Sequence, residues 1–398
     1  MGEGGKRLKR GVALGDPEWR SHFTDHALAL KSSHAGKADA MWNDRRILDL
    51  FGIELPIIQA PMAGANLSDM VIAVSEAGGL GSLPCALLSP EKAREELSRI
   101  RQKTAKPIAV NFFCHRAPVA DAQREAAWKR RLRAYYLELG LDPDMPTPPT
   151  ARAPFDETFL GLVEEFRPEV VSFHFGLPHQ DLLRRVKDAG AKVLSSATTV
   201  DEARWLEGEG CDAIIAQGFE AGGHRGIFLT DDIATQVGTM ALVPQVADAV
   251  AVPVVAAGGI ADARGIAAAF ALGASAVQIG TAYLFTPEAT ISPVHRQALK
   301  GADAERTALT NLFTGRPARG IVNRVMREVG PVSDLAPAFP LAGGALAPLR
   351  QRSEPLGSGD FMSLWSGQAA RLCREMSAGE LTKTLAREAL ERLGVRSA

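Results

Sequence analysis

Apolar and polar positions recur along the chain in a repeating unit that begins near Leu55. Each unit has a short run of β-branched or other apolar residues, a turn, a helical stretch and then the next apolar run. The runs lie at 55–62, 79–84, 105–113, 170–176, 191–197, 211–217, 252–259 and 274–281. Near-continuous apolar strands that alternate with helices indicate a parallel sheet covered by helices. Eight such units predict an α/β fold of the (β/α)8 TIM barrel type.

The repeat is interrupted between its third and fourth runs, which predicts an insertion at 114–165 within a barrel that spans 41–286. The insertion has a helical stretch at 126–140, and a proline-rich stretch that cannot form regular structure follows it. Residues 1–40 show no sustained apolar period and are interpreted as a flexible N-terminal extension.

The repeat ends after residue 286, and 287–398 is predicted to be a smaller, mainly helical region that packs over the barrel. Two stretches near its end, 361–376 and 378–394, have amphipathic patterns. We therefore expect two helices there, both packed against the barrel.

Charge and cysteine content narrow the classes of function. Lysine and arginine number 45 and aspartate and glutamate 46, so nothing indicates binding to nucleic acid or to an anionic membrane surface. The four cysteines form no CxxC pair, which argues against a zinc site or a disulfide framework and favours a reducing, cytoplasmic setting. Since no run of 18 or more apolar residues and no secretory signal pattern is found, we expect neither a membrane span nor a signal peptide.

The carboxyl ends of the predicted strands carry amides, imidazoles and glycines, and almost no carboxylates. In a (β/α)8 barrel the working residues lie at these ends, and phosphate is commonly bound after strands seven and eight. Gly258 and Gly259 end the seventh run, and Gly280 and Thr281 end the eighth, so main-chain N–H groups and one hydroxyl are expected to bind phosphate. Neutral amides suit the edge of a flat ring, so the pattern favours an organic cofactor and no metal. The other strand-end groups are Gln59, Met62, Asn111, His174, Gln217 and Gln278.

The stretch QGFEAGGHRG, 217–226, directly follows the sixth run. Its glycines allow the backbone to approach a ligand closely and permit positive φ angles. Taken alone, the stretch is equally typical of a surface turn. Arg225 within it is either a solvated side chain or part of the site.

Six motifs carry a family resemblance. They are PIIQAPMAGA at 56–65, SFHFGLP at 172–178, QGFEAGGHRG at 217–226, PVVAAGGIAD at 253–262, VQIGTAYLFT at 277–286 and LWSGQAARL at 364–372. Together, over residues 46–374, they resemble the nitronate monooxygenase family of the class I type, formerly called 2-nitropropane dioxygenases. Single motifs such as QIGT also occur in related flavin barrels, including enoyl-acyl-carrier-protein reductases and NADH:quinone reductases.

The resemblance implies an FMN-containing barrel. The implied cofactor-binding residues are Pro61, Met62, Asn111, Gln217, Gly222, Gly223, Gly258, Gly259, Gln278, Gly280 and Thr281. The backbone of Pro61 and Met62 is expected to lie against the isoalloxazine ring. Asn111 and Gln217 are expected to bind polar groups of the ring or of the ribityl chain. Gly222 and Gly223 are expected to approach the cofactor closely, and the remaining residues to bind its phosphate.

Two histidines are candidates for the catalytic role that the resemblance implies. His174 lies between two phenylalanines, and apolar surroundings keep an imidazole neutral near pH 7. We favour His174 as the base that removes the α-proton of the substrate. His224 ranks second and would orient the cofactor or the nitro group. Three further residues are interpreted as structural because no His/Asp relay accompanies them: Ser195, Ser196 and Cys85.

The function implied by the resemblance is FMN-dependent oxidative denitrification of alkyl nitronates, and of nitroalkanes after deprotonation. O2 would be the co-substrate, and a carbonyl compound and nitrite the products, with a monomer or homodimer expected. One alternative is an FMN-dependent NAD(P)H reductase of a quinone or an enoyl thioester. The other is a non-catalytic barrel that binds FMN or a phosphate ligand.

Overall fold

Eight parallel strands form the central sheet of the protein. The structure is a computed structural model, and it describes Met1 and residues 42–119, 121–150 and 152–394. The strands are β1 (Ile57–Gln59), β2 (Gly81–Pro84), β3 (Ile108–Phe113), β4 (Val170–His174), β5 (Lys192–Ala197), β6 (Ala213–Gln217), β8 (Val254–Ala257) and β9 (Ala276–Ile279). Their order in the sheet is β1, β9, β8, β6, β5, β4, β3, β2. A parallel bridge between Ile58 and Leu80 joins β1 to the start of β2, so the sheet closes into a barrel. The predicted TIM barrel is confirmed, and each predicted run contains one of these strands.

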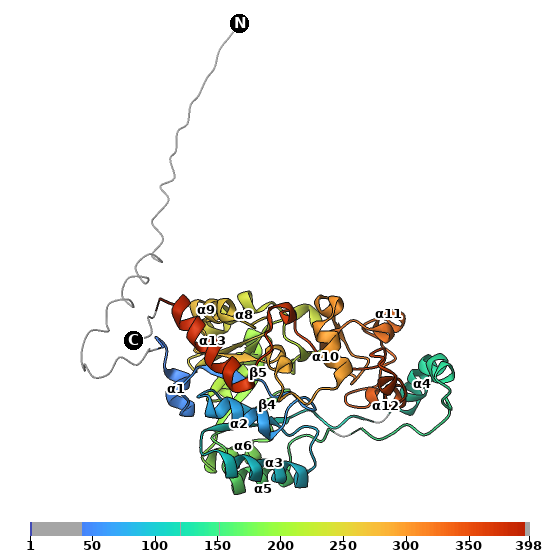
Figure 1. Ribbon diagram of the computed structural model, residues 1–398, viewed down its shortest axis with the longest axis horizontal. Helices are drawn as coiled ribbons and strands as arrows, with labels where there is room; N and C mark the ends of the chain where they lie inside the picture. The colour runs from blue at the N-terminus through green and yellow to red at the C-terminus, as the bar shows by residue number, and fades with distance from the viewer. Residues whose placement is uncertain (2–41, 120, 151, 395–398) are drawn as a thin grey trace, which may run out of the picture. The chain divides into compact units, whose positions relative to one another are not determined.

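Helices cover the outside of the barrel, and the C-terminal helix completes the layer (Figure 1). Those that precede or connect the strands are α1 (Arg46–Phe51), α2 (Ser68–Glu76), α3 (Pro90–Lys103), α5 (Glu157–Phe166), α6 (Gln180–Asp188), α7 (Val200–Gly208), α8 (Thr239–Ala249) and α9 (Ala263–Ala271). Helix α13 (Ala378–Arg392) contacts both α9 and α2, and its Leu381 and Leu385 are buried in the barrel core. The packing against the barrel that the amphipathic pattern at 378–394 predicted is thus confirmed, and α13 takes the place of the eighth barrel helix.

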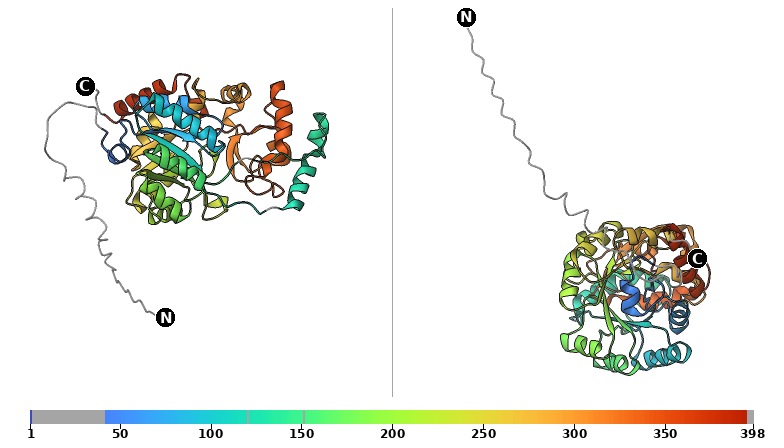
Figure 2. Two further views of the ribbon diagram at one scale, coloured as in Figure 1. Left: turned by 90° about the horizontal axis from the view of Figure 1, so that it is seen from below. Right: turned by 90° about the vertical axis from the view of Figure 1, so that its left-hand side faces the viewer.

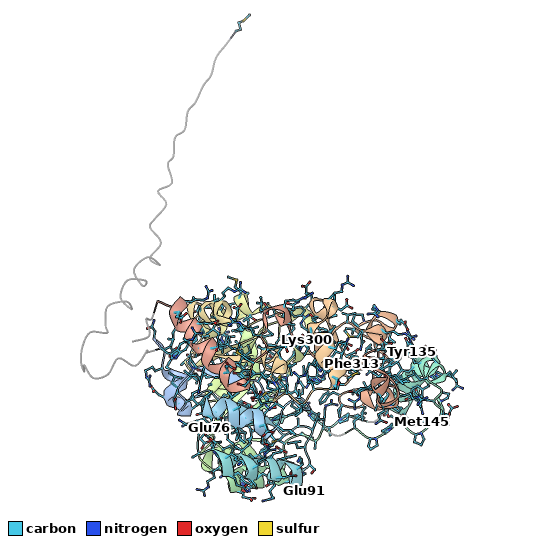
Figure 3. All side chains as sticks on the ribbon, viewed as in Figure 1. Glu76, Glu91, Tyr135, Met145, Lys300 and Phe313 are labelled. Atoms are coloured by element: carbon cyan, nitrogen blue, oxygen red, sulfur yellow. The ribbon has the colours of Figure 1, made fainter. Side chains whose placement is uncertain are left out.

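A second layer of structure is built from segments far apart in the sequence. The insertion contributes α4 (Ala122–Glu138), and η3 (Thr281–Phe285) directly follows β9. The region after residue 286 contributes α10 (Pro293–Lys300), α11 (Arg324–Val329) and α12 (Ala342–Ser353). Helices α4 and α12 pack side by side (Figures 1 and 2). The indole Nε1 of Trp128 donates to the carbonyl of Ala342 at 3.0 Å. Tyr135, Met145 and Phe313, labelled in Figure 3, belong to the apolar cluster that these segments share.

A three-stranded antiparallel sheet connects this second layer to the barrel. Strands β10 (Thr307–Thr310) and β11 (Ala318–Ile321) pair with each other, and β11 pairs with β7 (Gly223–His224). Strand β7 belongs to the stretch that follows β6, so the sheet is anchored at a barrel strand end. The apolar periodicity does not predict this sheet, because its strands are short and β11 pairs with β7 across about a hundred residues of sequence.

The predicted helix at 361–376 is wrong. Only Ala370–Leu372 forms a single 3-10 turn, and the rest is irregular apart from a bridge between Trp365 and Gly320. The N–H of Gln368 donates to the carbonyl of Glu220 at 3.0 Å, and the N–H of Gly367 donates to Thr281 Oγ1 at 2.9 Å. These bonds use backbone donors that a helix would need for itself, so tertiary contacts outweigh the amphipathic pattern.

The described elements from Trp42 onward belong to one compact unit. The proposed flexible extension, 1–40, lies outside the described residues apart from Met1, and the domain division proposed from the sequence stays a prediction. Among the described helices, none combines the length and the apolar character needed to cross a membrane.

Candidate functional site

A cavity of about 480 Å³ lies at the carboxyl ends of the barrel strands. Every residue predicted for the site lines it: Pro61, Met62, Asn111, His174, Gln217, Gly222, Gly223, His224, Gly258, Gly259, Gln278, Gly280 and Thr281. Parallel strands place their carboxyl ends at one face of a barrel, which is why residues spread over more than 200 positions meet here. Gln59 is the exception among the strand-end amides, since it is fully buried and accepts a bond from Ser82 N–H at 2.9 Å.

The strand ends are held by side-chain bonds to neighbouring backbone. The N–H of Met62 donates to Asn66 Oδ1 at 2.9 Å, and the amide of Asn66 donates to the carbonyl of Ser82 at 3.0 Å. The amide nitrogen of Asn111 donates to Ser172 Oγ at 2.9 Å and to the carbonyl of Ser172 at 3.2 Å. The amide oxygen of Asn111 thus stays available to a ligand in the cavity. Asn66 is a positioning residue that the sequence analysis did not identify.

His174 contacts two neighbours through its two ring nitrogens. Its Nε2 lies 3.2 Å from the carbonyl oxygen of His224, and its Nδ1 lies 3.2 Å from Ser196 Oγ. The amide of Gln217 donates to the same His224 carbonyl at 2.9 Å, and its oxygen accepts from Gly226 N–H at 2.7 Å. Burial lowers the pKa of His174 to about 4, so its imidazole is neutral at pH 7.

His224 belongs to β7 of the three-stranded sheet and lies beside His174, which ends barrel strand β4. Its Nε2 lies 2.9 Å from Thr314 Oγ1, a residue contributed by the region after the barrel. No partner of its Nδ1 is found in the described part of the chain. Burial, followed by the nearby positive charge of Arg152, lowers the pKa of His224 well below its usual range. Both histidines are therefore neutral and able to accept a proton.

Glycine backbone forms the opposite side of the cavity. Gly258 and Gly259 have φ angles of 115° and 69°, which residues with a Cβ rarely adopt. The N–H groups of Gly259 and Gly280 donate to no acceptor among the described residues. A Cβ on Gly223 would meet nothing within 4 Å, whereas one on Gly222 would lie 2.5 Å from Gly367 N. The close approach at Gly222 is thus made with the chain itself, whereas open space remains beside Gly223. N–H donors without a described acceptor are found at Gly259 and Gly280.

Aromatic rings and cations form the outer part of the cavity and its surroundings. Phe113, Phe175 and Phe339 pack around the two histidines. The guanidinium of Arg152 lies 5.9 Å from the centre of the Phe339 ring, and no described residue forms an ion pair with it. Glu354 is the only carboxylate among the residues that line the cavity. The described residues contain no group of three or more His, Cys, Asp and Glu side chains that could hold a metal ion.

Comparison with known proteins agrees with this arrangement. A sequence model described as "Nitronate monooxygenase" matches residues 44–388. The chain belongs to the nitronate monooxygenase family. A nitronate monooxygenase of Pseudomonas aeruginosa is 44% identical over 345 residues, which are 86% of this chain and 98% of the relative. One of Paraburkholderia phytofirmans is 41% identical over 351 residues, with 86% of this chain and 94% of the relative covered.

Solved structures resemble this nitronate monooxygenase family member over most of its length. A nitroalkane oxidase from Streptomyces ansochromogenes superposes with a TM-score of 0.80 and 39% identity, over 88% of this chain and 100% of the other. FabK from Thermotoga maritima gives a TM-score of 0.66 and 30% identity, over 89% and 98% of the two chains. The barrel and its outer layer are thus shared with known enzymes.

One residue of this family member lies where the sequence did not place it. Arg225 is neither solvated nor exposed to the cavity: it is fully buried. Its guanidinium donates to the carbonyls of Gly218 and Gln217 at 2.6 Å each and to Gln236 Oε1 at 2.9 Å. Arg225 therefore fixes the turn between β6 and His224. Ser196, which the sequence analysis interpreted as structural, also lines the cavity. Further lining residues that were not predicted include Arg152, Met362, Ser363, Trp365, Ser366 and Gly367.

Proposed function

We propose that this protein oxidises alkyl nitronates with O2 to a carbonyl compound and nitrite, with FMN as its cofactor. The observation that carries the proposal is the chemistry of the cavity: neutral imidazoles, nearby cations and a single carboxylate. A nitronate is a small anion, and such a cavity favours anions over cations. Membership of the nitronate monooxygenase family supports the same reaction.

The residues present fit FMN. Unpaired N–H groups at Gly259 and Gly280, with the hydroxyl of Thr281, suit a phosphate, and Gly258 and Gln278 line the same part of the cavity. Pro61 and Met62 would lie against the ring system, and Asn111, Gln217, Gly222 and Gly223 would border it. Bound FMN would supply the electron-accepting chemistry that no side chain provides.

The chain's own residues would bind the anion and move a proton. Because His174 and His224 are neutral, they can accept a proton when a neutral nitroalkane is the substrate. His174 is the proposed base, and His224, with its unbonded Nδ1, would orient the nitro group. A nitronate supplied as the anion needs no deprotonation. Changing His174 to Asn should therefore reduce nitroalkane turnover more than nitronate turnover.

One set of measurements on the purified protein tests the proposal. We expect a flavin absorbance spectrum, loss of flavin absorbance on anaerobic titration with ethylnitronate, and nitrite release with O2 uptake in air. Equal loss of turnover on nitroethane and ethylnitronate in the His174→Asn variant would contradict the base role of His174. Absence of nitrite with either substrate in the wild type would contradict the proposed function itself.

A reductase is the second candidate, because motifs such as QIGT also occur in flavin-barrel reductases and the fold resembles FabK from Thermotoga maritima at 30% identity. Rapid anaerobic bleaching of the flavin by NADH or NADPH, without nitronate, would favour it. Tight FMN binding with no reaction toward nitronate or NAD(P)H would instead favour a binding protein.

A further inference from the structure

The tautomer of His174 follows from its partners. A carbonyl oxygen only accepts hydrogen bonds, so the contact at 3.2 Å between His174 Nε2 and the His224 carbonyl places the ring proton on Nε2. A neutral imidazole carries one proton, so Nδ1 has the free lone pair. Ser196 Oγ, 3.2 Å from Nδ1, must then be the donor in that contact. The basic nitrogen of His174 thus faces a hydroxyl.

This tautomer is fixed by the surrounding chain. The His224 carbonyl also accepts from Gln217 Nε2 at 2.9 Å, and Gln217 is itself held by Gly226 N–H. Gly226 packs tightly there: a Cβ on it would lie 2.9 Å from Ser196 Cβ and 3.1 Å from His174 Cε1. A base must have its lone pair within reach of the proton it removes, directly or through one intervening group. At Nδ1 that intervening group is Ser196.

We propose that Ser196 relays the α-proton of a neutral nitroalkane to Nδ1 of His174, an inference that rests on the proposed function. The Cα–H bond breaks and its electron pair stays with the substrate, spread over the nitro group as the nitronate. The α-proton passes to Ser196 Oγ while the hydroxyl proton of Ser196 passes to Nδ1. Ser196 ends as a hydroxyl, and the imidazolium of His174 remains bonded to the His224 carbonyl through Nε2–H.

Ser196 is placed for this role, and its neighbour on β5 is not. Ser196 lines the cavity, and its Oγ has no described partner other than His174. Ser195 points to the other side of the strand: its Oγ donates to the carbonyls of Phe173 at 3.2 Å and Gly176 at 3.0 Å, and it is fully buried. The two serines are one residue apart and differ in what they touch, so Ser195 is a matched control.

The experiment compares Ser196→Ala and Ser195→Ala on nitroethane and on ethylnitronate. For Ser196→Ala we expect about a hundredfold loss of kcat/KM on nitroethane, with a much smaller loss on ethylnitronate. Ser195→Ala should alter the ratio of the two activities little. Unchanged nitroethane turnover in Ser196→Ala, or equal loss on both substrates, would overturn the relay while leaving the proposed function intact. Lack of ethylnitronate turnover in the wild type would overturn both.

Isotope effects on the wild type test the relay without any variant. In the relay the α-hydrogen and the hydroxyl proton move together, so both Cα-deuterated nitroethane and D2O should slow deprotonation, and their effects should multiply. Direct removal by His174 would show the substrate effect with no primary solvent effect. That result would overturn the proposal even if Ser196→Ala did not fold.

Discussion

The two sides of the cavity are built in different ways. On the barrel side, the side chains of Asn111, His174 and Gln217 are bonded to neighbouring backbone or hydroxyl groups. On the outer side, Arg152 has no ion-pair partner in the described chain. A group that is already bonded is held in one orientation, whereas an unpaired cation gains its partner only when an anion binds. We infer that the barrel side supplies orientation for chemistry and the outer side supplies affinity.

The largest expected effect is on the barrel side, at Arg225. Replacing Arg225 by Leu removes the guanidinium donor from the carbonyl of Gln217 and from that of Gly218, which keeps only the N–H of Ala221 at 3.1 Å. Hydrogen bonds from a charged group contribute about 1.5–3 kcal/mol each, so the free energy of unfolding should fall by about 3 kcal/mol. Urea denaturation measures this, with Arg204→Leu on the exposed face of α7 as the control. A loss as small as that of Arg204→Leu would show that Arg225 does not hold the strand end.

The same contrast explains which features the sequence predicts. The barrel strands are near-continuous apolar runs that can be found in the sequence, and a parallel barrel places their carboxyl ends at one face. A residue at the end of such a run, such as His174 or Gln217, is therefore predicted to lie in the site. For the outer side, no pattern in the sequence predicts which residues reach the cavity. Strand β7 pairs with β11 about a hundred residues later, and Ser366 and Gly367 are held by contacts with the strand-end turns rather than by a helix.

Side-chain partners are the second feature that sequence does not predict. Arg225 and Ser196 are of residue types found most often at the surface, and burial at a strand end is a property of the fold rather than of local pattern. The motifs placed both histidines in the cavity. They could not show which ring nitrogen of His174 carries the proton, since that depends on the His224 carbonyl.

An effect of intermediate size is expected on the free energy of unfolding when the pH is lowered. The pKa of His174 is about 4 in the folded protein and near 6.5 in the unfolded chain, so the unfolded chain binds the proton first as pH falls. The stabilisation that neutral His174 provides is complete above pH 6.5 and is lost between pH 6.5 and about 4. At pH 5 the loss is about 2 kcal/mol for this histidine. Replacing His174 by Gln should reduce the difference in unfolding free energy between pH 7 and pH 5 by that amount. The exposed His179→Gln is the control, and an unchanged difference in the His174→Gln variant would contradict the assignment.

The smallest expected effect is on the outer side, at Arg152. Replacing Arg152 by Gln removes an unpaired positive charge beside the cavity, so an anionic nitronate should bind more weakly while the chemistry at the barrel side is unchanged. We expect KM for ethylnitronate to rise about tenfold, equivalent to about 1.4 kcal/mol, with kcat close to wild type. Arg116→Gln removes the same charge from an exposed residue outside the cavity lining and should leave KM unchanged. A fall in kcat without a rise in KM in Arg152→Gln would show that the outer side takes part in orienting the substrate, and the division between the two sides would have to be abandoned.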